Sequence, residues 1–247
     1  EEKGHPARAL TLFASERTLS TELEYSDESL EVEQLSPEAL VGMKAVILAC
    51  PAAAAHPLAL KAQQEGAWVV DLSGAFRTEL GVPLVLGPDD PLLDGPIPGR
   101  IIELARPATQ AVLAALEPVR ATVGLQGLQV VALIGAAHAG QRGINALQQQ
   151  TAAILNAAEL DSQVFPHRLA FNLIPQVGGF TGPHTSAELA LKLEVARRLG
   201  PIPLACTQIA APFFHGTLLV ISAQLDRPLE AEKLREQLQA VAGLKVL

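Results

Sequence analysis

The segment Val69-Val70-Asp71-Leu72-Ser73-Gly74-Ala75-Phe76-Arg77 passes from an apolar run into a polar turn. Residues 67–72 are apolar enough for a buried strand, and Ser73-Gly74 is typical of the turn that ends one. Upstream, residues 44–49 form a second apolar run, and residues 57–65 have helical composition. A strand, a helix and a strand in this order predict a parallel crossover and therefore an α/β fold.

The second half of the chain alternates apolar runs with long helical segments. Residues 186–199 form a strong amphipathic helix that Gly200-Pro201 ends, whereas a helix beginning at residue 108 should stop at 116, before Pro118. Further helices are predicted over residues 144–158 and 229–242, with a loop over residues 135–143. Further strands are predicted over residues 128–134, 204–211 and 217–225 in this half and over residues 9–14 and 82–86 in the first half. Residues 87–99 are predicted to form a boundary region. We therefore predict a partial parallel-sheet domain over residues 1–106 and an α+β domain over residues 107–247. A mixed sheet with helices on one face leaves its other face for a second copy, so a homodimer is expected.

Composition excludes several classes of protein. The chain has 247 residues, 49% of them apolar and 4% aromatic, with a net charge of −8 and no dense Lys/Arg cluster, which argues against nucleic-acid binding. No apolar run is long enough to span a membrane. Cys50 and Cys206 have no metal-ligand spacing and are too few for a disulfide framework, so no metal site and a cytoplasmic location are expected. The chain begins at Glu1 without an initiator methionine or signal peptide, so a trimmed or partial product is expected.

Two motifs carry a resemblance to a known family. Residues 69–77 and the stretch Arg168-Leu169-Ala170-Phe171-Asn172-Leu173-Ile174-Pro175-Gln176 together resemble aspartate-β-semialdehyde dehydrogenases. The first motif is similar to one in N-acetyl-glutamyl-phosphate reductases as well, whereas the second, continued by residues 177–181, favours the aspartyl branch. The resemblance implies an NADP-binding Rossmann-like domain over residues 1–106, a dimerisation and substrate domain over residues 107–247, and reductive dephosphorylation of L-aspartyl 4-phosphate as the family reaction.

The resemblance also implies where a cofactor would bind. Ser15 and Arg17 match the family's Ala-Ser-x-Arg-Ser stretch, which holds the 2′-phosphate of NADP, and a planar guanidinium suits that task. Ser73 and Gly74 follow the strand predicted over residues 67–72. A solvated turn is the alternative for each pair. The family's glycine-rich turn would precede Glu1, so the NADP-binding domain is expected to be incomplete in this chain.

Three positions match the family's substrate site. Arg77 falls on the arginine that grips the substrate phosphate, Gln208 on an arginine that binds the α-carboxylate, and His215 on the acid/base histidine. Glutamine brings no charge, so carboxylate binding should weaken by about 1.5–3 kcal/mol. For His215, a partly buried histidine bonded to the backbone is the alternative. A small anionic ligand is thus an expected partner.

The family's nucleophile is missing. By resemblance it falls at Arg106, Pro107 or Ala108, none of which can form a thiolate, and the hydroxyl of Thr109 is a poor substitute without a dedicated base.

The family's polar loop is altered as well, because Ile134, Ala137 and His138 replace its Gln, Ser and Gly. Together with the lost nucleophile and Gln208, these changes resemble the non-catalytic paralogues called Usg-type proteins. The alternative is an NADPH-dependent reductase of an acyl phosphate or acyl thioester with an unorthodox nucleophile.

Overall fold

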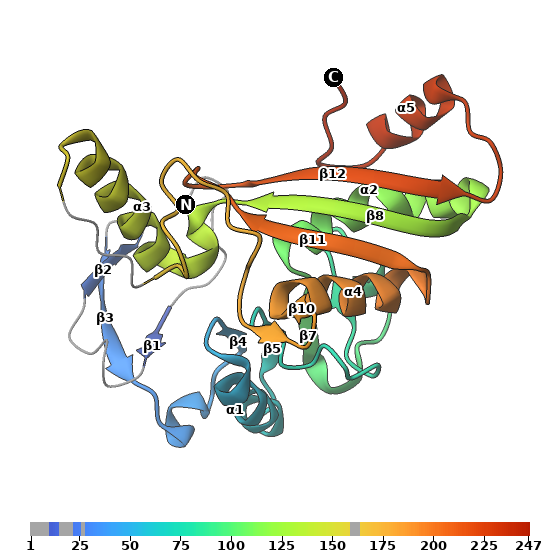
Figure 1. Cartoon of the computed structure of the whole chain (residues 1–247). Coiled ribbons are helices and arrows are strands. Elements are labelled where there is room, and N and C mark those ends of the chain that lie inside the picture. The colour runs from blue at the N-terminus through green and yellow to red at the C-terminus, as the bar shows by residue number, and fades with distance from the viewer. Residues whose placement is uncertain (1–9, 15–21, 26–27, 159–163) are drawn as a thin grey trace. The chain divides into compact units, whose positions relative to one another are not determined.

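The computed structural model describes residues 10–14, 22–25, 28–158 and 164–247 (Figure 1). The chain divides into two compact units, one formed by residues 1–73 with 99–101 and the other by residues 74–98 with 102–247. Each unit has its own strands and helices, and each is described by itself. No helix within the described ranges is long and apolar enough to cross a lipid bilayer.

The first unit contains a parallel strand pair joined by a helix. Strand β4 pairs in parallel with β5, from Ala45 opposite Trp68 to Leu48 opposite Asp71, and α1 connects them. A second group places β3 between β1, which is parallel to it, and β2, which is antiparallel. The elements of this unit are β1 Leu12–Ala14, β2 Glu22–Tyr25, β3 Glu28–Gln34, β4 Ala45–Leu48, α1 Ala52–Gln64 and β5 Trp68–Asp71. The predicted strand, helix and strand are confirmed.

Helix α1 is held to its strands by alanines. Ala55, Ala59 and Ala62 are fully buried, and their spacing places them on one face of the helix. The helix begins at Ala52, five residues before the predicted start, because a run of alanines has the highest helix propensity. Pro57 lies inside the helix at the expense of one backbone hydrogen bond.

The second unit is built on a three-stranded sheet in the order β11-β8-β12. Strand β8 is parallel to β11 and antiparallel to β12, and helices α2 and α4 pack on the sheet. A short parallel pair, β6 with β7, belongs to the same unit apart from the first residue of β7. The elements are β6 Leu84–Val85, β7 Ile101–Leu104, α2 Pro107–Val123, β8 Leu125–Ile134, α3 Gly140–Leu155, β9 Phe180–Thr181, β10 His184–Thr185, α4 Ser186–Leu199, β11 Leu204–Ala210, β12 Thr217–Leu225 and α5 Ala231–Gln239.

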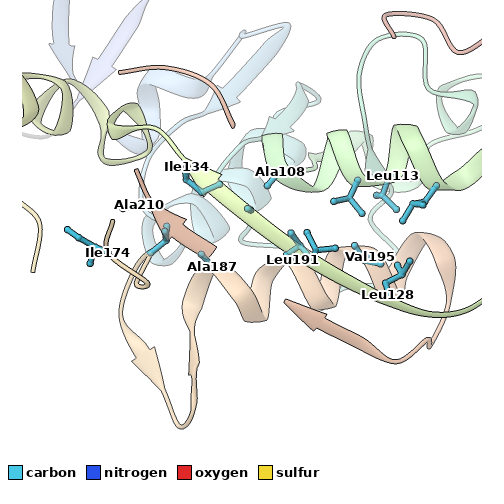
Figure 2. Packing of buried hydrophobic residues seen from close by; sticks show 14 of the residues in the cluster. Ala108, Leu113, Leu128, Ile134, Ile174, Ala187, Leu191, Val195 and Ala210 are labelled. Carbon is cyan, nitrogen blue, oxygen red and sulfur yellow. The ribbon is translucent and has the colours of Figure 1, made fainter. Parts of the chain in front are cut away.

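The core of this unit lies between the sheet and its two helices. Leu113 of α2, Leu191 and Val195 of α4 and Leu128 of β8 all point into it (Figure 2). Along β8 the residues alternate between this core and the opposite face. On that opposite face the sheet exposes an apolar surface formed by Val131, Leu218 and Val220.

The structure corrects several predicted boundaries. Helix α2 does not stop before Pro118 but continues to Val123, because burial of its apolar face outweighs the cost of an internal proline. The predicted loop over residues 135–143 holds a 3₁₀ turn at Ala136–Ala139 and the first residues of α3. The sequence did not predict strands β2, β3, β7, β9 and β10.

Candidate functional site

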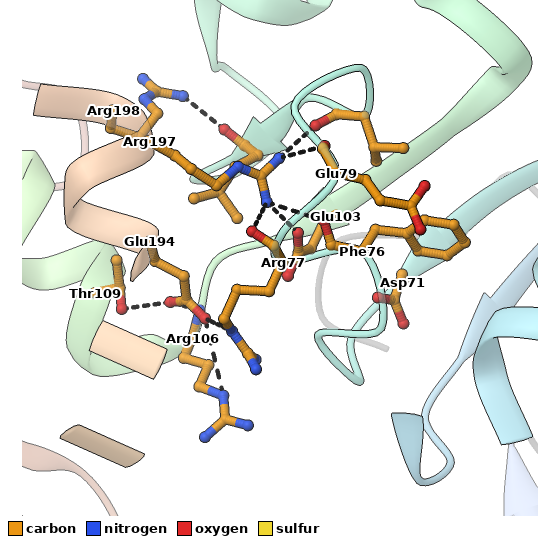
Figure 3. A network of polar contacts seen from close by, with 12 residues as sticks. Asp71, Phe76, Arg77, Glu79, Glu103, Arg106, Thr109, Glu194, Arg197 and Arg198 are labelled. Atoms are coloured by element: carbon orange, nitrogen blue, oxygen red, sulfur yellow. Dashed lines mark hydrogen bonds and ion pairs between the residues drawn. The ribbon is translucent and has the colours of Figure 1, made fainter. Parts of the chain in front are cut away.

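A buried arginine fixes the segment that carries Arg77. Arg197 of α4 donates hydrogen bonds to the carbonyl oxygens of Phe76 (3.3 Å), Arg77 (3.1 Å) and Val82, and to Oε2 of Glu103 (2.5 Å) (Figure 3). Its side chain is 9% exposed and that of Glu103 is fully buried. The guanidinium also donates to the Glu79 carbonyl oxygen (3.5 Å), so it binds four main-chain oxygens and a strand carboxylate, and residues 76–82 are held to α4 and β7.

A second glutamate on α4 meets the start of α2. Oε1 of Glu194 accepts a hydrogen bond from Nε of Arg77 at 3.0 Å, and Oε2 accepts from Thr109 Oγ1 at 2.5 Å and from the Arg106 backbone N–H at 3.2 Å. Nε of Arg106 lies 3.9 Å from Oε1. A carboxylate at a helix N-terminus is electrostatically favourable, and this one is fully buried. Glu194 therefore joins Arg77 to the segment where the family resemblance places the nucleophile.

The cluster around Glu194 has more positive than negative charge. Among the described residues it contains the guanidinium groups of Arg77, Arg106 and Arg197 and the carboxylates of Glu103 and Glu194, which leaves one net positive charge. Burial, and after it the neighbouring Arg77, lower the pKa of Arg106. Burial also raises the pKa of Glu103, although Arg197 opposes that shift.

Gly74 is required by the position of the Arg77 side chain. Its φ of +77° lies in the left-handed region, and a Cβ built on it would lie 1.8 Å from Nη2 of Arg77. That Nη2 atom is buried and has no hydrogen-bond partner among the described residues. Gly74, predicted to bind a cofactor, thus lies directly against the Arg77 guanidinium.

Gln208 and His215 lie on β11 and in the loop after it. The Gln208 side chain is 5% exposed, and its Nε2 donates to the Ala187 carbonyl oxygen at 2.9 Å, so its amide is already engaged at the start of α4. His215 is exposed, in the loop between β11 and β12. The roles predicted for both residues remain predictions.

The altered loop after β8 packs against the loop that carries His215. The backbone N–H groups of Ala136 and Ala137 donate to the carbonyl oxygens of Phe213 (2.8 Å) and Phe214 (2.9 Å). Nδ1 of His138 lies 2.9 Å from the Gly135 carbonyl oxygen. Because β8 and β11 are parallel, both loops lie at the carboxyl edge of the sheet, where open α/β sheets bind ligands.

Neither cysteine lies at the start of α2. Cys206 is on β11, and its thiol donates to the Glu188 carbonyl oxygen at 3.6 Å. Burial raises the pKa of Cys206 to about 11, although Lys192 opposes the shift. Cys50 belongs to the first unit, where burial also raises its pKa. Both thiols are therefore poor nucleophiles at neutral pH.

The first unit has features that fit a nucleotide. Ser73 donates to Oδ1 of Asp71 from its backbone N–H (2.9 Å) and its hydroxyl (2.6 Å), which fixes the turn after β5. Beside β5, β4 leads into α1, whose first turn has exposed alanines and no side-chain cap. Small side chains and a helix N-terminus at this edge suit a phosphate-bearing ligand. Ser15 and Arg17 lie outside the described residues.

The polar cluster on α4 was missed by motif reasoning. Glu194 and Arg197 lie on a helix predicted as amphipathic, and charged residues in such a pattern normally indicate the solvent-exposed face. The sequence did contain an indication of this cluster: three charged residues, Glu194, Arg197 and Arg198, lie close together in the last turns of a helix that is rich in apolar residues. Within the described part of the chain no group of His, Cys, Asp and Glu could hold a metal ion.

Comparison with known proteins gives a consistent result for both parts of the chain. Residues 2–89 match the model of the semialdehyde dehydrogenase NAD binding domain, and residues 116–247 match that of the semialdehyde dehydrogenase dimerisation domain. The two matched ranges contain the motifs quoted at the outset.

Individual relatives agree with these matches. A USG-1 protein homolog of Pseudomonas aeruginosa is 26% identical, covering 99% of this chain and 74% of its own length, and the aspartate-semialdehyde dehydrogenase of Bacillus subtilis is 28% identical, with 92% and 68% covered. The structure of a probable aspartate-semialdehyde dehydrogenase from Pseudomonas aeruginosa superposes with a TM-score of 0.86 at 28% identity, covering 98% of this chain and 73% of that one. The fold is also shared with aspartate semialdehyde dehydrogenase II of Vibrio cholerae, at a TM-score of 0.88 and 24% identity over 99% of this chain and 74% of that one.

Proposed function

Because the chain belongs to the aspartate-semialdehyde dehydrogenase family, we propose that it is a member that binds ligands but does not catalyse the family reaction. The observation that supports the proposal is the start of α2, where Arg106, Pro107 and Ala108 stand at the positions to which the resemblance assigns the nucleophile. Reduction of an acyl phosphate through a thioester needs a thiolate at that point. No side chain there can supply one.

The neighbouring hydroxyl does not replace the missing thiol. Thr109 is fully buried, and its Oγ1 already donates to Glu194. An attacking group must reach the carbonyl carbon of the substrate, and a side chain without exposed surface does not. Cys206, with a pKa of about 11, is held on β11 by the Glu188 carbonyl oxygen. These observations favour a non-catalytic protein over a reductase with an unorthodox nucleophile.

NADP is the cofactor that we propose for the NAD binding domain. Ser15 and Arg17 support it by resemblance, as does the edge of the first unit formed after β4 and by Ser73 after β5. When bound, NADPH supplies a hydride. We expect Arg17→Ala to weaken NADP binding by about tenfold and to leave NAD binding unchanged, because only NADP has a 2′-phosphate for the guanidinium. Calorimetric titration of the unmodified protein and of Arg17→Ala with NADP and with NAD checks this. Equal affinity of the two proteins for NADP contradicts it.

We also propose a homodimer formed through the exposed face of the β11-β8-β12 sheet. Val131, Leu218 and Val220 are 38%, 54% and 55% exposed there, which supports burial against a second copy. We further propose that the boundary between the two domains lies between Arg106 and Pro107, and that the protein is located in the cytoplasm. The two free cysteines support the location.

The decisive experiment is an assay of the purified protein with aspartate semialdehyde, phosphate and NADP, beside the Bacillus subtilis relative as the active control. We expect NADP reduction at least about 10⁴-fold slower than in the control, the usual loss when a covalent nucleophile is removed. Phosphate-dependent NADP reduction within about a hundredfold of the control would instead establish the reductase with an unorthodox nucleophile. Absorbance of NADPH gives the rate directly.

A further inference from the structure

We propose that Arg106, one of the three residues at the expected nucleophile position, forms with Arg77 a two-guanidinium site that binds a phosphate-type dianion. The inference rests on the proposed function, since it concerns the same site. It goes further by giving a binding role to Arg106, one of the three residues where the resemblance places the family's thiol.

The first argument is the number of guanidinium N–H groups left without an acceptor. Arg77 uses Nε on Glu194, and its Nη2 has no partner among the described residues. Arg106 touches Glu194 only through a 3.9 Å approach of its Nε, and its guanidinium makes no hydrogen bond within the described part of the chain. Each guanidinium carries five N–H donors in a planar fork, so most of these donors remain for an acceptor with several oxygens.

The second argument is the excess positive charge. Glu103 is matched by Arg197, and Glu194 must compensate both Arg77 and Arg106. Two guanidinium groups held near one carboxylate repel each other, and this repulsion adds to burial in lowering the pKa of Arg106. A phosphate-type dianion can place oxygens against both guanidinium groups at once and attracts each of them more strongly than a monoanion does.

The third argument is the direction and exposure of the two side chains. Figure 3 shows the guanidinium groups of Arg77 and Arg106 directed to the same side of Glu194, away from Arg197. The Arg106 side chain is 43% exposed and that of Arg77 is 17% exposed, so a ligand can reach the pair from solvent. The Arg77 guanidinium is held by Glu194, which limits the ordering cost of binding on that side of the site.

Calorimetric titration of the purified protein with inorganic phosphate at about pH 8 and low salt tests the proposal, with formate as the monoanion. We expect Arg106→Gln to weaken phosphate binding by about tenfold or more, the loss typical for a charge-assisted hydrogen bond, and to change formate binding much less. Arg142→Gln is the matched control, because it removes the same charge from an exposed arginine on α3 and should bind phosphate as the unmodified protein does.

The outcomes separate this inference from the proposed function. If Arg106→Gln binds phosphate as tightly as the unmodified protein, or if the latter binds phosphate no better than formate, the two-guanidinium site is wrong, whatever the turnover assay gives. If the unmodified protein turns over aspartate semialdehyde yet Arg106→Gln loses phosphate, the site stands and the non-catalytic proposal fails. Thermal unfolding of each variant checks that a lost affinity is not lost folding.

Discussion

Replacing Arg197 by methionine is expected to lower the free energy of unfolding of the second unit by about 3–5 kcal/mol, the usual cost of removing one partner of a buried ion pair. Methionine keeps the apolar stem but leaves Glu103 fully buried without its cation. The carbonyl oxygens of Phe76, Arg77 and Val82 lose their donor in the same step. Urea unfolding followed by far-ultraviolet circular dichroism measures the loss, since the single tryptophan, Trp68, belongs to the first unit.

The effect of Arg197→Met should depend on pH in a defined direction. Burial already raises the pKa of Glu103, and removing Arg197 takes away the main influence that lowers it. A carboxyl whose pKa is higher in the folded than in the unfolded protein binds its proton more tightly when folded, so stability falls as pH rises above the unfolded value of about 4.3. The free energy of unfolding that Arg197→Met loses relative to the unmodified protein should therefore be smaller at about pH 5 than at about pH 8.

Two further variants control the Arg197 experiment. Arg142→Met removes an exposed arginine and should change stability by less than about 0.5 kcal/mol. The double variant Arg197→Met/Glu103→Met removes both charges and should recover part of the loss, because an apolar pair of similar volume can replace a buried ion pair. A loss below about 1 kcal/mol for Arg197→Met alone would show that Arg197 does not hold residues 76–82 in place.

The sequence predicts some elements to the residue and others poorly, for identifiable reasons. Helix α4 matches its predicted range because a capping box of Thr185 and Glu188 begins it and Gly200, at a φ of +72°, ends it. Strand β12 matches as well. The predicted range of α2 is too short because Pro118 alone predicts a helix end, whereas tertiary packing of the apolar face extends the helix to Val123.

The candidate site was predicted in part, for the same reason. The predicted positions of Arg77 and Arg106 were read from motifs, which identify residues but not their partners. Glu194 lies 117 residues from Arg77 in sequence, and no motif connects the two. The contact exists because Arg197 of α4 binds the carbonyl oxygens of the segment that carries Arg77, an arrangement that only the three-dimensional structure provides.

Glu194→Gln is expected to reduce stability and to strengthen anion binding in the same variant. Both oxygens of Glu194 accept hydrogen bonds, from Arg77 on one side and from Thr109 and the Arg106 N–H on the other. The glutamine amide must turn an NH₂ group toward one of these donors, so one set of bonds is lost. Loss of charge-assisted hydrogen bonds in a fully buried position should cost about 1.5–3 kcal/mol, measured by urea unfolding as for Arg197.

Phosphate affinity should move in the opposite direction, because Glu194 competes with the anion for the two guanidinium groups. Its replacement raises the net charge of the cluster by one, and we expect phosphate to bind about tenfold more tightly by calorimetry. Thr109→Val is the matched control: it removes one hydrogen bond to Glu194, costs about 1 kcal/mol and leaves the charge and the phosphate affinity unchanged. Unchanged or weaker phosphate binding by Glu194→Gln would mean that Glu194 positions the arginines rather than competing for them. The opposite signs of the two effects distinguish a site that gives up stability for ligand binding from a purely structural ion pair, in which removing the carboxylate only destabilises.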